Sequence, residues 1–501
     1  MMQIYTTHSR NCGSLIDEVT ANGVFRHRGT LLVGGIIAIG IALRILYLGA
    51  PSFWLDEALS VVFARLSWSR FAHLTVSREL NMLPYYLLLR GWIRLGTEEW
   101  IVRSLSALCS IATLPLLYRL GTRLFGARVG RIALGLLAVH PYHIRFAQEA
   151  RGYSLMLLLV TASTLLLVRA TASSSRHPIG VWIAYVATSV LAVYTHFYAG
   201  LAIVAQWASL AIARPRDLPW KHFALAVAAI GILLLPLAAF VFLGHADSAA
   251  WIPRTTFRRV DYLVYALLGA GSSAGEHKLE FVPYAVVLFA AGASARVAWR
   301  TQRRERETWH QALVISGAAL PIILVLTISL FKPIFVDKYL IECLPFTVLL
   351  VAVGIDRLRP RTLSLAALVV TLVIPVHALV GYYRRSDKDD WRAATRYVLG
   401  SARPGDAALF FPSFVVAPFD YYRARFDASA GSVEVIYPGA LGDGDVGNML
   451  TRLPDRHRRL WAVFNQDGEA GNVLRDSLSG RYRMESDRQF TGVRVVLYDT
   501  R

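Results

Sequence analysis

Eleven long apolar segments constrain the fold of this sequence more than any other feature. They cover residues 30–50, 100–121, 129–146, 151–169, 180–197, 198–213, 222–243, 281–299, 311–331, 339–356 and 362–382. Most approach the roughly 20 residues that an α-helix needs to cross a bilayer. Because 55% of the 501 residues are hydrophobic, a water-soluble fold is excluded. We expect an α-helical polytopic membrane protein with about 11 transmembrane helices.

Arginine-rich loops predict the orientation in the membrane. A net charge of +19 can indicate nucleic-acid binding, but here the arginines cluster between apolar segments, as they do in cytoplasmic loops. The clusters are Arg119–Arg131, Arg169–Arg176, Arg214–Lys221, Arg300–Arg306 and Arg357–Arg361. With residues 1–29 as a cytoplasmic tail, eleven spans place every cluster in the cytoplasm. The sequence therefore predicts a multi-pass protein of the inner (plasma) membrane, with the lipid bilayer and not nucleic acid as its partner.

One shorter apolar stretch tests this topology. Residues Leu83–Gly96 are apolar, but they are too few for a span and contain Arg90 and Arg94. A helix that lies in the membrane interface fits this composition better than a span does. We therefore expect residues 51–99 to form one large external loop within a transmembrane domain that covers residues 30–383.

The composition changes after Tyr383. Residues 384–501 lose the long apolar runs and gain charge, glycine and short alternating stretches. Trp391–Leu399 has the pattern of an amphipathic helix. Four stretches have the pattern of short strands, namely Ala407–Phe411, Val433–Tyr437, Leu460–Phe464 and Val493–Tyr498. We predict a small α/β domain over residues 384–501, on the external (periplasmic) side.

Polar and ionisable residues gather on the predicted external side. Asp56 and Glu57 follow the first apolar segment directly, where a chain leaves the bilayer. The other external candidates are Arg145, Glu149, Arg151, Tyr153, His196, Tyr198, Lys338 and Tyr339. Ionisable side chains at the edge of hydrocarbon are costly and are usually retained for function. Acids, bases and hydrogen-bonding aromatics on one face of an apolar bundle define a candidate active site.

The order of several short motifs resembles a known family. They are FWLDEA at 53–58, NMLPYYLLLRGWIRLG at 81–96, RSLSAL at 103–108, QEARGYSL at 148–155, YTHFYA at 194–199, DKYLIECLP at 337–345 and KDDWRAATRYV at 388–398. Together they resemble the polytopic glycosyltransferases with the GT-C fold. The chain looks most similar to glycosyltransferase family 39 and its bacterial relatives, which include protein O-mannosyltransferases and aminoarabinose transferases of lipid A.

This resemblance implies the transfer of a monosaccharide from a polyprenyl-phosphate carrier, with inversion of the anomeric centre. Asp56 then takes the position of the base that accepts the acceptor's proton, and Glu57 either joins the catalysis or orients Asp56. Lys338, Arg151 and Arg145 are the candidate cations for the leaving lipid phosphate. The other candidates are substrate-binding groups: Glu149, Tyr153, His196, Tyr198 and Tyr339.

Two departures from the family pattern are visible. Leu83-Pro84 stands where many relatives have two prolines, which changes the start of a helix but removes no chemical group. Lys338-Tyr339 stands where many have Arg-Tyr, so the charge is kept but a bidentate fork is lost.

The resemblance names no cofactor, and a metal site is not favoured. A divalent metal at Asp56 and Glu57 is an alternative because hard cations bind carboxylate oxygens. However, no second pair of acids is evident on the external side. The three cysteines, Cys12, Cys109 and Cys343, show no metal-ligand spacing.

Other functions compete with the transferase. Asp56 and Glu57 can be interfacial carboxylates at a helix start, or the coupling site of a lipid or sugar transporter or flippase. Transporters commonly show internal repeats and charged groups near the midplane, and neither is visible here. A third reading is a scaffold whose external domain binds partners. The sequence favours the enzyme, while its acceptor, whether glycan, lipid or protein, stays open.

Overall fold

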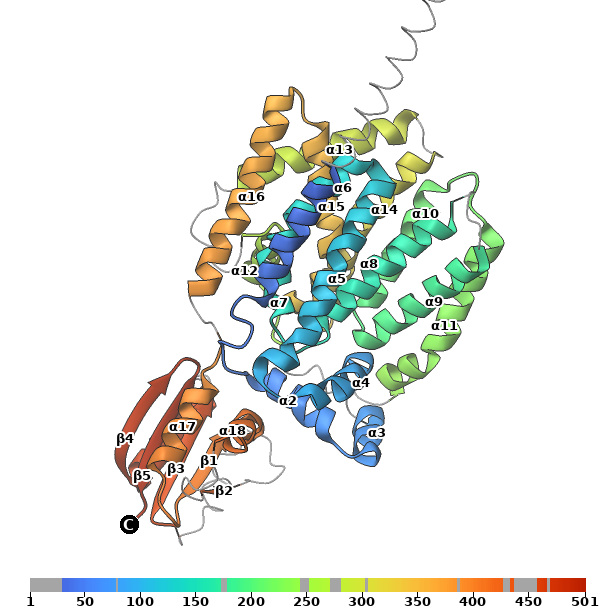
Figure 1. The fold of residues 1–501 in the computed structure, drawn as a ribbon. Helices are drawn as coiled ribbons and strands as arrows, with labels where there is room; N and C mark the ends of the chain where they lie inside the picture. The colour runs from blue at the N-terminus through green and yellow to red at the C-terminus, as the bar shows by residue number, and fades with distance from the viewer. Residues whose placement is uncertain are drawn as a thin grey trace, which may run out of the picture. The chain divides into compact units, whose positions relative to one another are not determined.

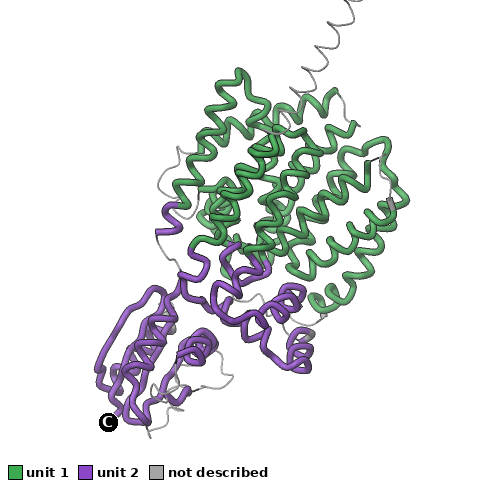
Figure 2. Tube along the Cα trace, in the orientation of Figure 1, with its two compact units in different colours: residues 1–46, 107–145, 153–379 green, residues 47–106, 146–152, 380–501 purple. Residues whose placement is uncertain are grey.

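The computed structural model describes residues 29–77, 80–172, 178–243, 252–270, 281–301, 305–384, 388–426, 433–436, 457–465 and 469–501. The chain is mainly helical and ends in a five-stranded sheet (Figure 1). It divides into two compact units (Figure 2). The first, called here the helical unit, comprises residues 1–46, 107–145 and 153–379. The second, called here the loop–sheet unit, comprises residues 47–106, 146–152 and 380–501.

The helical unit contains most of the long apolar helices. Its helices are Gly29–Ile45, α6 (Ala127–Ala138), α7 (Pro141–Ala147, in part), α8 (Tyr153–Ala170), α9 (Pro178–Thr195), α10 (Ala199–Ala213), α11 (Trp220–Leu243), α12 (Phe257–Leu267), α13 (Val282–Thr301), α14 (Arg306–Ser329), η5 (Asp337–Cys343) and α15 (Leu344–Arg357). Most of α5 (Glu99–Phe125) and α16 (Arg361–Arg384) also belongs to it.

Every predicted apolar segment coincides with helical structure. Among the described residues, seven helices are long and apolar enough to cross a membrane, and three further apolar helices are shorter. The predicted segment 129–146 is divided, because Val139 leaves helical geometry and α7 begins at Pro141. Proline has no N–H to continue the helix and disfavours helical geometry in the residue before it. The number and length of the apolar helices are those of a multi-pass membrane protein.

Close approaches hold α15 against its neighbours. A Cβ at Gly354 of α15 would collide with the backbone of Val287 in α13, and one at Gly317 of α14 would collide with the ring of Phe346 in α15. Small residues allow helix backbones to approach closely within a bilayer, where van der Waals packing drives helix association. These two glycines therefore set the spacing around α15.

The loop–sheet unit begins with short helices. They are α2 (Leu55–Arg65), α3 (Trp68–Ser77), α4 (Leu83–Trp92) and the 3₁₀ turn η1 (Ile93–Leu95), followed by the first turns of α5. The predicted interfacial helix at 83–96 corresponds to α4 and η1. Pro84 lies in the first turn of α4, where a missing N–H costs no hydrogen bond. Gly96 ends this stretch with a φ of 146°, a conformation open to glycine.

The C-terminal sheet has the order β2-β1-β3-β5-β4. Its strands are β1 (Ala407–Phe411), β2 (Glu434–Ile436), β3 (Arg459–Asn465), β4 (Arg483–Phe490) and β5 (Val493–Asp499). β1 pairs in parallel with β2 and β3, while β3–β5 and β5–β4 are antiparallel. All four predicted strands are present, although Tyr437 lies outside the described residues. β4 was not predicted, because its largely exposed polar residues follow no apolar alternation.

Helices cover the sheet on both faces. One face, with Leu409, Ala462 and Val496, packs against Leu474 and Leu478 of α20 (Glu469–Arg481). The opposite face carries alternate residues of the same strands, because successive side chains in a strand point to opposite sides. There, Trp461 of β3 contacts Tyr397 of α17 (Trp391–Ser401), with ring centroids 5.7 Å apart. Likewise, Phe410 of β1 contacts Phe419 of α18 (Val416–Arg423) at 4.8 Å.

The chain divides differently from the prediction at one point. The first external loop, residues 51–99, was expected to belong with the transmembrane domain. By its contacts it belongs instead to the same compact unit as the C-terminal domain. Hydrogen bonds over more than 300 residues of sequence account for this, for example from the Phe53 N–H to the Tyr422 hydroxyl at 2.7 Å.

Candidate active site

Asp56 and Glu57 occupy the first turn of α2 but meet different surroundings. Adjacent residues of an α-helix point about 100° apart. The Asp56 side chain is 23% exposed, whereas the Glu57 side chain is fully buried. The two carboxylates therefore have different partners and different access to solvent.

Asp56 is paired with Arg151. The Asp56 Oδ2 lies 3.8 Å from the Arg151 Nε, and the Arg151 side chain is 11% exposed. Arg151 also donates a hydrogen bond from Nη1 to the Tyr86 hydroxyl of α4, at 3.1 Å. The segment 146–152, which runs from the end of α7 to the start of α8, thus presents a cation beside a partly exposed carboxylate. A proton acceptor and an anion-binding group stand together here.

Glu57 is the buried centre of a second network. Arg103 of α5 donates to both of its oxygens, from Nε to Oε1 and from Nη2 to Oε2, each at 2.7 Å. The Ala150 N–H donates to Oε1 at 2.9 Å and the Lys388 Nζ donates to Oε2 at 3.0 Å. Burial raises the pKa of the Glu57 carboxyl, but the charges of Arg103 and Lys388 outweigh burial and lower that pKa to about 2. Glu57 is thus a carboxylate whose two oxygens are both occupied.

Lys388 connects this network to the C-terminal domain. Besides Glu57, its Nζ donates to the Gln148 carbonyl at 2.8 Å. Burial and the nearby Arg103 charge lower the pKa of the Lys388 ammonium to about 8, against the opposing effect of Glu57 and Glu149. The predicted site residue Glu149 is buried beside this lysine. Lys388 and Glu57, which pair with each other at the start of α2, therefore also hold segment 146–152 through hydrogen bonds to its backbone.

Five other predicted site residues form an aromatic cluster in the helical unit. Tyr153 begins α8, His196 and Tyr198 lie in the turn between α9 and α10, and Lys338 and Tyr339 belong to η5. The His196 ring lies 4.5 Å from the Tyr339 ring, 5.5 Å from Tyr198 and 5.8 Å from Tyr153, measured between centroids. The Lys338 Nζ lies 5.9 Å from the ring centroids of both Tyr153 and Tyr339. Three segments far apart in sequence thus meet through their rings, and one ammonium group lies beside two of these rings.

Arg145 has a different neighbour. From α7 it donates to the Tyr262 hydroxyl of α12 at 3.2 Å. Three residues earlier on α7, the Tyr142 hydroxyl donates to the Asp337 carbonyl of η5 at 2.8 Å. α7 therefore contacts the start of the segment that carries Lys338.

The donor set at Asp56 does not resemble a metal site. Within the described part of the chain, no three His, Cys, Asp or Glu side chains lie close enough to hold a metal ion. Both Glu57 oxygens are bound by Arg103, Lys388 and a backbone N–H, so Glu57 has no lone pair left for a metal ion. Hard divalent cations are usually bound by more than one such group.

Sequence reasoning missed three cations of this region. Arg103, Lys388 and Arg392 lie in motifs that carry the family resemblance, but no role was assigned to them. A signal existed for Arg103, because an arginine inside an apolar segment is costly unless it is paired. For Lys388 and Arg392 no local signal exists, since their carboxylate partners lie about 300 residues away in sequence.

Comparison with known proteins supports the predicted resemblance. Residues 82–241 match the family model described as dolichyl-phosphate-mannose-protein mannosyltransferase. No curated protein has a matching sequence. The solved structures with similar folds include ArnT from Cupriavidus metallidurans in the apo state, with a TM-score of 0.59 and 13% identity over 93% of this chain and 98% of that chain.

Two further structures carry lipid phosphates. ArnT from the same organism bound to undecaprenyl phosphate gives a TM-score of 0.58, with 14% identity over 93% of this chain and 97% of that one. The oligosaccharyltransferase AglB from Archaeoglobus fulgidus, in complex with an inhibitory peptide and a dolichol-phosphate, gives 0.57, with 10% identity over 95% of this chain and 74% of that one. The fold is therefore the GT-C fold of membrane glycosyltransferases. The family-model match over residues 82–241 agrees with this fold and supports the predicted resemblance.

Proposed function

We propose that this protein transfers a monosaccharide from a polyprenyl-phosphate carrier to an acceptor hydroxyl or phosphate on the non-cytoplasmic side of the membrane. Support comes from the family model, whose description names a dolichyl-phosphate-linked sugar. Further support comes from the similar ArnT and AglB structures, which hold undecaprenyl phosphate and dolichol-phosphate. The arginine-rich loops support a cytoplasmic amino terminus and an external C-terminal domain.

The observation that carries the proposal is the pair formed by Asp56 and Arg151. The acceptor oxygen attacks the anomeric carbon, and the bond from that carbon to the phosphate oxygen breaks. Asp56 accepts the acceptor's proton, and the electron pair leaves with the lipid phosphate. Arg151, 3.8 Å from Asp56, stabilises the charge that develops on that phosphate. A single displacement of this kind inverts the anomeric centre.

The remaining predicted residues receive narrower roles. Glu57 was predicted to be catalytic, but both of its oxygens are engaged, so we propose that it positions α2 and the segment that carries Arg151. Glu149 acts with it through the charge on Lys388. In the helical unit, Lys338 is proposed to bind the donor phosphate. The rings around it supply apolar faces and hydrogen bonds to substrate: Tyr153, His196, Tyr198 and Tyr339. Arg145 is proposed as a further cation for substrate.

The test measures turnover of polyprenyl-phosphate mannose and other polyprenyl-phosphate sugars by the purified full-length protein in lipid nanodiscs. Release of polyprenyl phosphate and labelled product are both quantified. Asp56→Asn is expected to lower kcat by about 10²–10⁴-fold, because a positioned base contributes that much to the rate. It should still bind undecaprenyl phosphate.

The matched control is Asp487→Asn, which removes another aspartate–arginine pair, with Arg494 of the sheet. It should keep wild-type turnover. Near-normal turnover by Asp56→Asn would refute the base assignment. Transport of the sugar lipid across vesicles without a covalent product would refute the transferase itself.

A further inference from the structure

The loop that leads to Asp56 has no regular secondary structure of its own. Residues 46–54 connect the helix Gly29–Ile45 to α2, and residues 48–52 form the part of this connection called here the loop 48–52. Their backbone carbonyls cannot be satisfied by a helix or a sheet, and carbonyl groups without a partner are costly when they are removed from water. The position of Asp56 at the start of α2 depends on what holds this loop.

Two arginines bind every carbonyl of this loop. Arg103 donates to the carbonyls of Leu48, Pro51 and Ser52 at 3.0, 2.8 and 3.0 Å. Arg392 donates to the carbonyls of Gly49, Ala50 and Pro51 at 3.2, 3.2 and 3.4 Å. Arg103 comes from α5, and Arg392 comes from the first turn of α17 in the C-terminal domain. The five consecutive carbonyls are thus shared between the two guanidinium groups.

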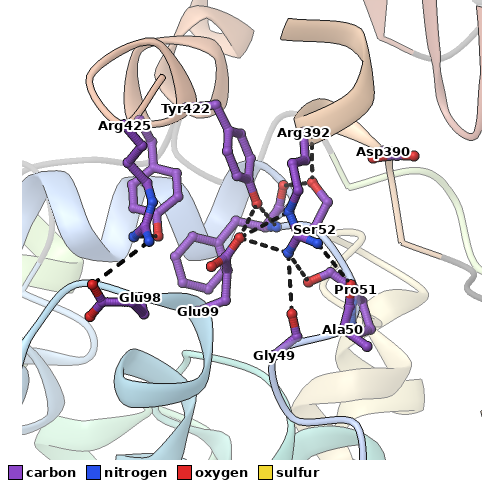
Figure 3. Close-up of polar contacts among 12 residues, drawn as sticks. Gly49, Ala50, Pro51, Ser52, Glu98, Glu99, Asp390, Arg392, Tyr422 and Arg425 are labelled. Carbon is purple, nitrogen blue, oxygen red and sulfur yellow. Dashed lines mark hydrogen bonds and ion pairs between the residues drawn. The ribbon is translucent and has the colours of Figure 1, made fainter. Parts of the chain in front are cut away.

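Each guanidinium is itself fixed by a carboxylate. Glu57 holds Arg103 through both of its oxygens. Glu99 holds Arg392, with its Oε1 accepting from Nη2 at 2.7 Å and from Nε at 3.2 Å. Figure 3 shows Arg392 between Glu99 and the loop residues Gly49, Ala50 and Pro51. A planar guanidinium with five donors suits this arrangement, because it can bind a carboxylate and several carbonyls at once.

Two more contacts join the C-terminal domain to the same loop. The Arg392 N–H donates to the Ser52 hydroxyl at 3.1 Å. The Tyr422 hydroxyl accepts from the Phe53 N–H at 2.7 Å and donates to Glu99 at 3.0 Å (Figure 3). A cavity of about 260 Å³ opens beside these groups, lined by Gly49, Glu99, Arg392, Tyr422, Arg425 and Phe426. Its charged groups already have partners: Glu99 and Arg392 bind each other, and Arg425 pairs with Glu98 and donates to the Thr97 carbonyl. This argues for a clamp and not for a ligand site.

We propose that Arg392 is a positioning residue of the transferase. Through Arg392, with Tyr422 beside it, the C-terminal domain fixes the loop 48–52 and so the direction in which α2 presents Asp56. This inference rests on the proposed function, because position matters only if Asp56 reacts. Small displacements of a catalytic group are costly, and a misplacement of about 1 Å can lower a rate by about 10²-fold.

The experiment compares Arg392→Ala with Arg396→Ala in the full-length protein. Arg396 lies one turn further along α17 and contacts the ring of Phe426 at 4.9 Å, with no contact to the loop. Arg392→Ala is expected to lower kcat by about 10–100-fold, while the Kd for undecaprenyl phosphate changes less than about twofold. Arg396→Ala should leave both within about twofold of wild type. Tyr422→Phe, which keeps the ring, should lower kcat by a smaller factor of about 3–10, the loss expected for one hydrogen bond.

Three outcomes would overturn the proposal. The first is an unchanged kcat in Arg392→Ala. The second is a fall in kcat matched by an equal fall in undecaprenyl phosphate affinity, which would indicate a binding role. The third is a wild-type kcat in Arg392→Lys. A lysine can pair with Glu99, but its single ammonium cannot also donate to the loop carbonyls as the planar guanidinium does.

Hydrogen exchange separates this inference from the proposed function. The backbone amides of residues 53–60 should exchange faster in Arg392→Ala than in Arg396→Ala, whatever the enzyme's activity. If the wild-type protein transfers no sugar but exchange rises in this way, the proposed function fails and the clamp on the loop stands. If transfer is observed and exchange does not rise, the clamp is wrong and the transferase stands.

Discussion

The loop–sheet unit and the helical unit hold their candidate site residues by different forces. The loop–sheet unit uses carboxylate–guanidinium pairs, with Glu57 on Arg103 at 2.7 Å and Glu99 on Arg392 at 2.7 Å. The helical unit uses ring contacts around Lys338, with centroid separations from 4.5 to 6.2 Å. A buried ion pair is costly to break on one side, whereas each ring contact contributes little. Substitutions in the two units should therefore lower the free energy of unfolding by different amounts.

The largest effect is expected from breaking the buried pair of the loop–sheet unit. Arg103→Met leaves the buried Glu57 with Lys388 as its remaining cation. It also leaves the Leu48 and Ser52 carbonyls without their donor and Pro51 with Arg392 alone. We expect a loss of about 3–5 kcal/mol in the free energy of unfolding, as for other buried pairs that lose one partner. The double variant Arg103→Met/Glu57→Gln should recover part of this loss. Chemical unfolding in detergent, followed by tryptophan fluorescence, measures both, and equal losses in the two variants would argue against the pair.

The same pair should make stability depend on pH. The pKa of Glu57 falls from 4.5 to about 2 on folding, so its contribution is present above pH 4.5 and is lost as the pH falls toward 2. The loss should amount to about 3 kcal/mol. Unfolding free energies at several pH values should show it in the wild type and much less in Arg103→Met/Glu57→Gln. A wild-type profile that is flat over this window would contradict the assignment.

Lys388 predicts a second rise of stability with pH, in a separate window at high pH. Its pKa falls from 10.5 to about 8 on folding, so the unfolded chain binds more protons between these values and stability should rise with pH across this window. Lys388→Met should remove the rise. A rise of equal size in the variant would assign it to other groups.

The ammonium of the helical unit should affect substrate binding more than stability. Lys338→Met is expected to raise the KM for a polyprenyl-phosphate sugar about tenfold, equivalent to about 1.4 kcal/mol, because a cation beside the phosphate is lost. Lys338→Arg should keep a KM near the wild-type value. If Lys338→Met lowers kcat and leaves KM unchanged, the lysine acts in the chemical step.

The smallest effect is expected within the ring cluster. Tyr339→Leu removes ring contacts to His196, Tyr198 and Tyr153 but keeps an apolar side chain. We expect a loss of about 0.5–1.5 kcal/mol in unfolding free energy, the range for an aromatic pair. Thermal unfolding measures it. A loss as large as that of Arg103→Met would remove the contrast between the two units.

Local patterns predicted the helices and most of the sheet. The apolar segments coincide with helices because hydropathy is a local property. β1, β3 and β5 follow from short apolar runs that are buried along almost their whole length. β4 escaped prediction, since an exposed polar edge strand carries no such pattern. The division of segment 129–146 into two helices at Pro141 was missed for a different reason. Hydropathy measures only how apolar a residue is, and not that proline lacks the N–H that continues a helix.

The candidate site was predicted in part. Asp56 and Arg151 were expected to share a site and lie 3.8 Å apart. The rings of Tyr153, Tyr198 and Tyr339 lie around His196, while their role as substrate-binding groups stays a prediction. Glu57 differs from its neighbour in burial, a contrast that appears only once α2 is packed. The roles of Arg103 and Arg392 depend on the carbonyls of an irregular loop, and no sequence pattern marks a carbonyl that needs a donor.

The clamp on residues 48–52 has a consequence for biosynthesis. The ribosome makes this loop some 340 residues before it makes Arg392. Until then the carbonyls of Gly49 and Ala50 must take water as their donor, so a nascent or truncated chain carries its reactive aspartate on an unfinished support. A chain that ends before Arg392 is therefore expected to hold Asp56 less firmly than the full-length chain does.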